Sequence, residues 1–297
     1  MKKFLIAICL LMAIVLLSAC ASEKLEYTIY ADFSAEETSL LESKSSSIPI
    51  KSATEKVFSF STRKEIDRHA SAVDNYTFSV DGKTYSIPFN ESYETAANAS
   101  EKVRKFGQYN RYLSVTDGYI LETNIETKEI ELFIGSNSEL QNAKGNLTEA
   151  QAKEKADAII TEMYGAEVFN GYKHKNTLAS KADRSEEQDG YSVTYQRSVF
   201  GYPTSDDITI SLNMNGDLLA VNAKGKGMLA NAEKDITKEQ IDNAIKAVEE
   251  NFSDSWSVHE SSATIVMDSE GDYYVRMGIS RNTDGMVTAV QVYINVE

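Results

Sequence analysis

Residues 146–163, NLTEAQAKEKADAIITEM, carry the strongest local signal in the chain. Thr148 and Gln151 stand three positions apart at the start of this stretch, which is the spacing of a helix capping box. Apolar side chains then recur every three or four positions, as on the buried face of a helix: Ala152, Ala156, Ile159, Ile160 and Met163. The stretch therefore predicts an amphipathic helix that ends at Gly165.

The same pattern returns at residues 236–252, ITKEQIDNAIKAVEENF. Thr237 and Gln240 form the second capping pair, 89 positions after Thr148 (237 minus 148). The apolar positions again follow helical spacing: Ile241, Ala244, Ile245, Val248 and Phe252. The chain thus contains two similar predicted helices.

Alternating strand patterns with tight turns follow each predicted helix. The expected strands are 191–199, 208–214 and 218–223 after the first helix, and 263–267, 273–279 and 287–296 after the second. A helix followed by an antiparallel meander therefore occurs twice. Regular β-α-β alternation is absent, so a doubly wound parallel sheet is not expected.

Strand signals also dominate residues 53–145. Tyr76–Val80 and Lys83–Ile87 flank an Asp-Gly pair and predict a hairpin. The polar, Ala-rich stretch 92–106 predicts a helix, and 119–134 predicts a second hairpin. The sequence leaves open whether residues 92–134 are a third copy of the repeat.

The N-terminus has the features of an export signal. Lys2 and Lys3 precede an apolar run of 14 residues, which is shorter than the roughly 20 that a membrane-spanning helix needs. The next residues, Leu17-Ser18-Ala19-Cys20, resemble the bacterial lipobox. That resemblance implies cleavage between Ala19 and Cys20 and attachment of lipid to the Cys20 thiol. A plain secretory signal and a signal-anchor helix are the alternatives.

These patterns predict an α+β fold made of tandem units, each with one helix packed on an antiparallel β-meander, preceded by a lipoprotein signal peptide. The expected parts are a signal peptide (1–19), a lipidated tether (20–52), a β-rich α+β domain (53–145) and two units (146–232 and 233–297). The KGKG sequence at 224–227 is expected to be a flexible connector between those units.

The helix that opens with Ile/Leu-Thr-x-x-Gln, followed by a sheet whose hairpin carries Asn/Asp-Gly, resembles the PepSY-like domains of secreted bacterial proteins. The resemblance covers residues 146–223 and 236–297. It implies a small antiparallel sheet wrapped on one helix, with a role in peptidase inhibition or envelope regulation. It supplies no catalytic residues.

Composition and charge limit the class of partner. The chain has 45 acidic and 30 basic residues and a net charge of −15, which argues against nucleic-acid binding because phosphate contacts need clustered Lys and Arg. Removal of residues 1–19 would leave Cys20 as the only cysteine, so a disulfide scaffold is excluded. The acidic surface either stands off anionic lipid or recruits cations and basic partners.

No catalytic or metal-binding motif emerges from the sequence. His69, His174 and His259 lack a zinc-helix spacing, and the S-x-x-K match at Ser61–Lys64 lacks its companion motifs. Residues 268–272, DSEGD, fail the EF-hand pattern and read as a hairpin turn. Asp206-Asp207 reads as a pair of exposed loop acids. We therefore assign no catalytic residue, metal or cofactor, and expect a protein that is not an enzyme.

Tyrosines in the predicted strands are the candidate partner surface, because their rings can grip a peptide: Tyr191, Tyr195, Tyr202, Tyr273 and Tyr274. The sequence predicts a lipid-anchored protein on the extracytoplasmic side of the cell membrane. Its expected role is a non-catalytic binding or regulatory module for a peptidase, another envelope protein or a peptide. The alternatives are a carboxylate-dependent cell-wall hydrolase and a solute-binding lipoprotein.

Overall fold

The computed structural model describes residues 27–32, 48–53, 62–99, 102–135, 144–181, 188–252, 256–268 and 270–296. The predicted signal peptide, Ala19 and Cys20 lie outside the described residues, as does Ser61 of the S-x-x-K match. No helix in the described ranges combines the length and the hydropathy needed to cross a bilayer.

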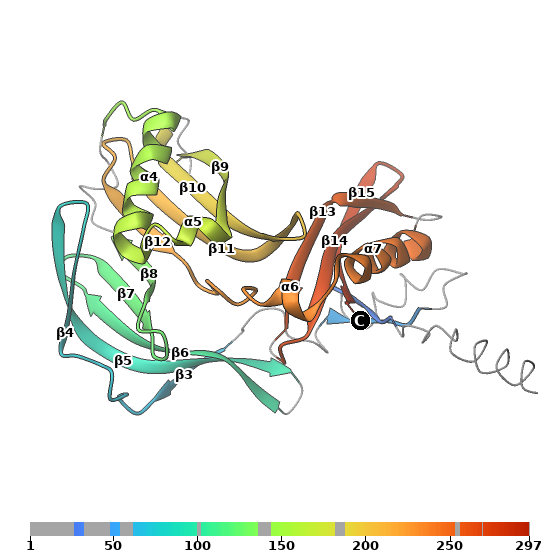
Figure 1. Cartoon of the computed structure of the whole chain (residues 1–297), viewed down its shortest axis with the longest axis horizontal. Helices are drawn as coiled ribbons and strands as arrows, with labels where there is room; N and C mark the ends of the chain where they lie inside the picture. Colours follow the sequence, from blue (N-terminus) through green and yellow to red (C-terminus); the bar gives the residue numbers. More distant parts are fainter. Residues whose placement is uncertain are drawn as a thin grey trace, which may run out of the picture.

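Strands make up most of the described chain (Figure 1). The strands are β1 (Ile29–Ala31), β2 (Ile50–Ser52), β3 (Thr62–Ile66), β4 (Asn75–Val80), β5 (Lys83–Ala99), β6 (Lys102–Ser114), β7 (Tyr119–Asn124), β8 (Ile130–Gly135), β9 (Tyr172–Lys181), β10 (Gln188–Val199), β11 (Tyr202–Asn213), β12 (Leu218–Asn222), β13 (Ser257–Met267), β14 (Tyr273–Thr283) and β15 (Met286–Asn295). The helices are α4 (Glu149–Tyr164), α5 (Val168–Gly171), α6 (Ala232–Asp235) and α7 (Lys238–Phe252).

The predicted fold class, tandem α+β units of one helix on a separate meander, is wrong. All fifteen described strands belong to one mixed sheet, whose main path runs β2-β1-β15-β14-β13-β11-β12-β8-β7-β6-β5-β3. The described parallel contacts are β1 with β2 and a short one between β11 and β13. Strand β11 makes the sheet continuous. It pairs with β12 along one part of its length, and at Thr204 it pairs with β13 of the C-terminal region.

The two predicted helices are confirmed, with their caps. At α4, Gln151 donates its backbone N–H to the Thr148 hydroxyl (3.3 Å), and Thr148 donates its own N–H to the Gln151 side chain (3.0 Å). Thr237 and Gln240 make the same pair of bonds at the start of α7, at 3.2 and 2.8 Å. Each cap satisfies backbone donors that the first turn of a helix leaves free.

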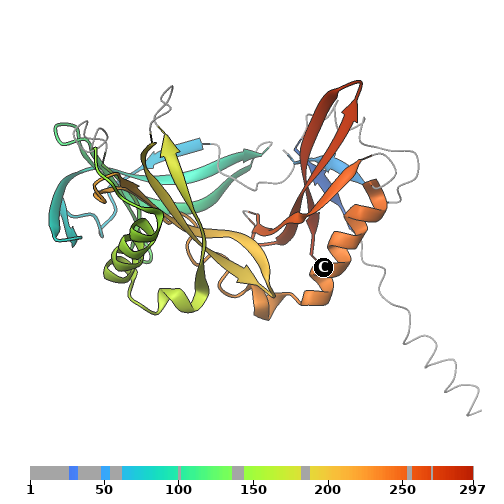
Figure 2. The ribbon, with the colours of Figure 1, turned by 90° about the horizontal axis from the view of Figure 1, so that it is seen from above.

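Each helix covers its own hydrophobic core, and Figure 2 shows α4 and α7 against different parts of the sheet. Helix α4 packs on β9 and β10, with Ile159 and Ile160 fully buried. Helix α7 packs on β13, β14 and β15, with Ile241 and Phe252 fully buried. The two cores supply the apolar burial that holds the curved sheet together.

The tip of the β10–β11 hairpin joins the two cores. Val199, at the end of β10, is buried in the core under α7, as is Leu229 of the connector. Tyr202 packs against the same core and donates its hydroxyl to Asp242 of α7 (2.7 Å). The C-terminal region is therefore not a unit on a flexible link.

The KGKG connector is fixed at three of its four residues. Lys224 is ion-paired with Glu122 (2.6 Å) and Lys226 with Glu129 (2.7 Å). The N–H of Gly227 donates to the Asp206 carboxylate (3.1 Å). These contacts replace the flexible connector that the Gly-Lys composition predicts.

The helix predicted at 92–106 is also wrong, because residues 92–99 belong to strand β5 and residues 102–106 to strand β6. Ser92 donates a buried hydrogen bond to Asn110 on the neighbouring strand (2.8 Å). On the other side of the sheet, Tyr93 stacks on Tyr109 with ring centroids 5.3 Å apart. Polar residues that look solvent-exposed in the sequence are therefore paired across strands.

Strand β1 lies within the range predicted as the tether. It pairs antiparallel with β15 at the opposite end of the chain, and Ile29 and Ala31 are fully buried in the core under α7. Strand β2 pairs with β1 in turn. Residues 29–31 and 50–52 are thus part of the folded body.

Candidate binding site

A cavity of about 360 Å³ lies where β1, α6 and the strands β14 and β15 meet. Ten of the described residues line it, and these include three tyrosines, two aspartates and no basic residue: Thr28, Tyr30, Asp235, Ile236, Gly271, Asp272, Tyr273, Tyr274, Asn295 and Val296. The volume falls at the low end of the range of about 300–1,000 Å³ for ligand pockets. We call it the Tyr-Asp pocket.

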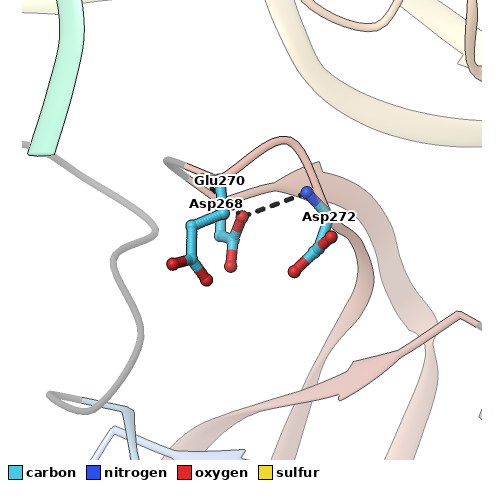
Figure 3. A group of neighbouring side chains, drawn as sticks. All are labelled: Asp268, Glu270 and Asp272. Atoms are coloured by element: carbon cyan, nitrogen blue, oxygen red, sulfur yellow. Dashed lines mark hydrogen bonds between the residues drawn. The ribbon is translucent and has the colours of Figure 1, made fainter.

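The turn between β13 and β14 contributes Gly271 and Asp272 to one rim of the pocket. Figure 3 shows the acidic side chains of this turn. The buried Asp268 accepts the backbone N–H groups of Glu270 (2.8 Å) and Asp272 (3.1 Å) through one carboxylate oxygen. Gly271 takes φ +92°, a conformation that favours glycine. This side-chain-to-backbone bonding folds the turn and holds Asp272 at the rim.

The carboxylates of Asp268, Glu270 and Asp272 have ligand atoms within 4.8 Å of one another. The Asp268 carboxylate also accepts the Tyr274 hydroxyl (3.4 Å), in addition to the two backbone donors. These bonds give Asp268 a role in the turn, in agreement with the hairpin interpretation of DSEGD. We assign no metal to the cluster.

The tyrosines of the pocket are held in place by neighbouring groups. Tyr274 is buried and packs edge-on against Tyr30 with centroids 6.0 Å apart. Tyr273 donates its hydroxyl to Asp235 of α6 (2.7 Å), and burial together with this bond raises the pKa of Tyr273 to about 12. The Tyr273 phenol is therefore neutral at physiological pH and remains a hydrogen-bond donor.

The five tyrosines predicted as a partner surface do not lie together. Tyr273 and Tyr274 line the pocket, whereas Tyr202 is bonded to α7. Tyr195 is buried under α4, where its hydroxyl donates to Asp157 (2.5 Å), and Tyr191 packs against the same core. Sequence reasoning missed Tyr30 and Asp235, which reach the pocket from β1 and α6.

The other candidates from the sequence are scattered over the described chain. Each histidine is exposed and contacts a hydroxyl group: His69 with Ser71 (2.9 Å), His174 with Thr177 (2.9 Å) and His259 with Ser280 (2.8 Å).

A further cavity of about 590 Å³ lies beside the start of α4. None of the described residues that line it is aromatic, so the Tyr-Asp pocket is the better candidate site.

Asp206 was predicted to be an exposed loop acid, and the structure corrects this. It lies in β11 with 1 % exposure, accepts the Tyr172 hydroxyl and is ion-paired with Arg197 (2.9 Å). The N–H groups of Gly227 (3.1 Å) and Leu229 (3.4 Å) also donate to it. Asp206 is therefore a buried anchor between β10–β11 and the connector.

Glu131 of β8 provides a prediction about pH. It is 5 % exposed, burial raises its pKa, and a bond from Asn124 (2.9 Å) opposes that shift only in part. A raised folded-state pKa favours the protonated form, so the stability linked to Glu131 is present below its unfolded pKa and is lost as the pH rises through the folded value. In urea unfolding from pH 4 to pH 8, Glu131→Gln should gain stability relative to wild type as the pH rises.

Glu126→Gln, in the neighbouring exposed turn, is the control for that experiment. Its stability should follow the wild-type pH profile. A constant difference between wild type and Glu131→Gln over the whole pH range would contradict the assignment.

The sequence matches no protein-family model and no curated protein. Among solved structures, the chain is similar to the Bacillus megaterium YpeB C-terminal domain, with a TM-score of 0.32 and 10% sequence identity. The match covers 69% of this chain and 84% of that chain. A likeness this weak defines neither the fold nor the function, and the PepSY-like resemblance of the sequence stays a prediction.

Proposed function

We propose that this chain is a lipid-anchored, extracytoplasmic, non-catalytic module that binds a segment of a protein partner in the Tyr-Asp pocket. The observation that carries the proposal is the pocket itself, in which held tyrosine rings and two carboxylates converge. Rigid aromatic groups with a polar end are typical of protein interaction sites.

The carboxylates of Asp235 and Asp272 also meet the composition that the hydrolase alternative requires, namely two acids in one cavity. The Tyr273 phenol donates a hydrogen bond to the Asp235 carboxylate (2.7 Å), so the protein itself already engages one of the two acids. A glycosidase needs an acid that is positioned to give a proton to the leaving group. This contact favours binding over hydrolysis.

The solute-binding alternative expects two lobes with parallel sheets and a cleft between them. The described sheet is antiparallel except at β1–β2 and at a short contact between β11 and β13. That topology gives the solute-binding alternative no support.

In-cell photo-crosslinking tests the binding function. A photoreactive amino acid in place of Glu270, beside the pocket rim, should give one discrete adduct with a partner protein. The same amino acid in place of Val115, which is 84% exposed in the β6–β7 turn, should not give it. The same adducts from both positions, or none from position 270, would count against the proposed function.

The anchor is tested separately by Cys20→Ser. The wild-type protein is expected to remain with the membrane fraction after a salt wash, since two acyl chains hold a protein stably in a bilayer. The Cys20→Ser protein should lose the lipid, shown as the absence of the diacylglyceryl mass on the N-terminal peptide. Cys9→Ser, in the apolar run, is the matched control and should be lipidated. An unmodified wild-type N-terminus would refute the lipid anchor.

A further inference from the structure

We infer that the group bound in the Tyr-Asp pocket is the cationic side chain of a lysine or arginine on the partner. This inference rests on the proposed function and specifies the chemistry of its ligand. It is supported by the acidic residues of the described lining, by the nature of the rings, and by two complete arrangements of the same kind elsewhere in the chain.

The part of the lining that the structure describes contains acidic residues and no basic one. Asp235 and Asp272 contribute carboxylates, and Asp268 and Glu270 lie in the same turn as Asp272. Asp235 accepts the Tyr273 hydroxyl, but no lysine, arginine or histidine of the described ranges is ion-paired with it. Among the described lining residues, the Asp235 carboxylate is therefore the candidate acceptor for a cationic ligand.

The chain repeatedly combines a tyrosine, an acid and a cation. At α7, Tyr202 donates its hydroxyl to Asp242 (2.7 Å), and the Lys238 ammonium is 2.7 Å from Asp242. That ammonium also lies 5.5 Å from the centroid of the Tyr202 ring. The cation thus contacts a carboxylate and a ring that are themselves joined by a hydrogen bond.

A second, largely buried example repeats this arrangement. Arg197 is ion-paired with Asp206 (2.9 Å) and lies 4.7 Å from the ring of Tyr172, which donates to the same acid. A related case is Lys224, which is 2.6 Å from Glu122 and 5.4 Å from the Tyr109 ring, although that tyrosine is bonded to Glu131. Cation–π attraction and ion pairing act together at each site.

The pair of Tyr273 and Asp235 has the tyrosine and the acid of this arrangement, with the same 2.7 Å bond as Tyr202 and Asp242. Here the described chain provides no cation. The cavity beside the pair supplies space for one side chain, and Tyr30 and Tyr274 offer apolar surface to its methylene groups. In the proposed complex, a cation of the partner takes the position that Lys238 has beside Tyr202 and Asp242.

Fluorescence anisotropy with the full chain in detergent micelles tests the inference. The probes are four labelled pentapeptides, Gly-Gly-X-Gly-Gly with blocked ends, in which X is arginine, lysine, citrulline or glutamate. Arginine and lysine peptides should bind at least tenfold more tightly than the citrulline peptide, which has a similar shape to the arginine peptide but no charge. The glutamate peptide should not bind.

Asp235→Asn should weaken binding of the arginine peptide at least tenfold. The matched control is Asp284→Asn, which removes the same charge from an exposed turn of the same region. Asp284 has φ +54°, a conformation that asparagine tolerates, so the control should fold and should bind within twofold of wild type. Thermal unfolding of both variants monitors their folding, and Tyr273→Phe provides a second test that keeps the aromatic ring.

Several outcomes would overturn the inference. Equal binding of the arginine and citrulline peptides would show that charge is not recognised, although the binding function would stand. Equal losses in Asp235→Asn and Asp284→Asn would indicate attraction by the net charge alone. No binding of any peptide, with the adduct from position 270 present, would refute the cationic ligand, whereas loss of that adduct as well would refute the binding function.

Discussion

Asp206→Ala is expected to destabilise the protein by about 3–5 kcal/mol, because it leaves Arg197 with a partly buried charge that has lost its ion-pair partner. The substitution also removes the acceptor for the Tyr172 hydroxyl and for the N–H groups of Gly227 and Leu229. Urea unfolding at pH 7, followed by circular dichroism, gives the free-energy difference.

Asp207→Asn is the matched control, since it removes the neighbouring charge on the same strand. Asp207 is half-buried, and burial raises its pKa. Its ionised form is therefore disfavoured in the folded state, so at pH 7 its removal should leave the stability unchanged or slightly higher. A loss for Asp206→Ala no larger than the effect of Asp207→Asn would refute the role of Asp206 as an anchor.

Ile29→Ala is expected to cost about 2–5 kcal/mol, the range for truncation of a buried aliphatic side chain. Ile29 is fully buried in the core under α7, and its strand completes the sheet beside β15. Thermal or urea unfolding of a soluble form that begins before residue 27 measures the loss. Gln291→Ala, on an exposed position of β15, should change the stability by no more than about 0.5 kcal/mol.

Deletion of residues 1–32 tests the contribution of the whole strand β1. It would delete β1 and leave the edge of β15 unpaired, and an open edge pairs readily with other chains. We expect such a truncated protein to be less stable and to associate in size-exclusion chromatography. A monomer with wild-type stability would show that β1 contributes little to the fold.

Local signals in the sequence predicted the local features of the structure. The capping pairs join residues only three positions apart, so Thr148 and Thr237 identify both helix starts. The Asp-Gly hairpin at residues 81–82 is likewise a local feature, with both residues at positive φ. In these elements the determining contacts lie within a few residues of one another.

The connection between the core under α4 and the core under α7 could not be predicted from such local patterns. Residues 202–207, YPTSDD, contain a proline and two adjacent acids, which argues against a strand. They extend β11 because Arg197 and the amide of Gly227 satisfy Asp206. One of these partners lies 21 positions away (227 minus 206), so the pattern of YPTSDD itself does not reveal it.

The residues of the candidate site could also be predicted only where a local sequence pattern marks them. The alternating strand pattern identified Tyr273 and Tyr274 as candidates. It did not reveal that Tyr195, on β10, faces α4. Tyr30 lies 243 positions before Tyr273 in the sequence (273 minus 30), and its place in the pocket depends on the pairing of β1 with β15. A contact over that separation leaves no periodic pattern.

The pairing of β1 with β15 brings the candidate site close in sequence to the predicted lipidation position. Thr28 lines the Tyr-Asp pocket and lies eight positions after Cys20 (28 minus 20). A fully extended chain of that length spans at most about 30 Å. If Cys20 carries the proposed lipid, Thr28 would lie within that distance of the headgroups, and we would then expect a partner to present its basic residue in a juxtamembrane segment.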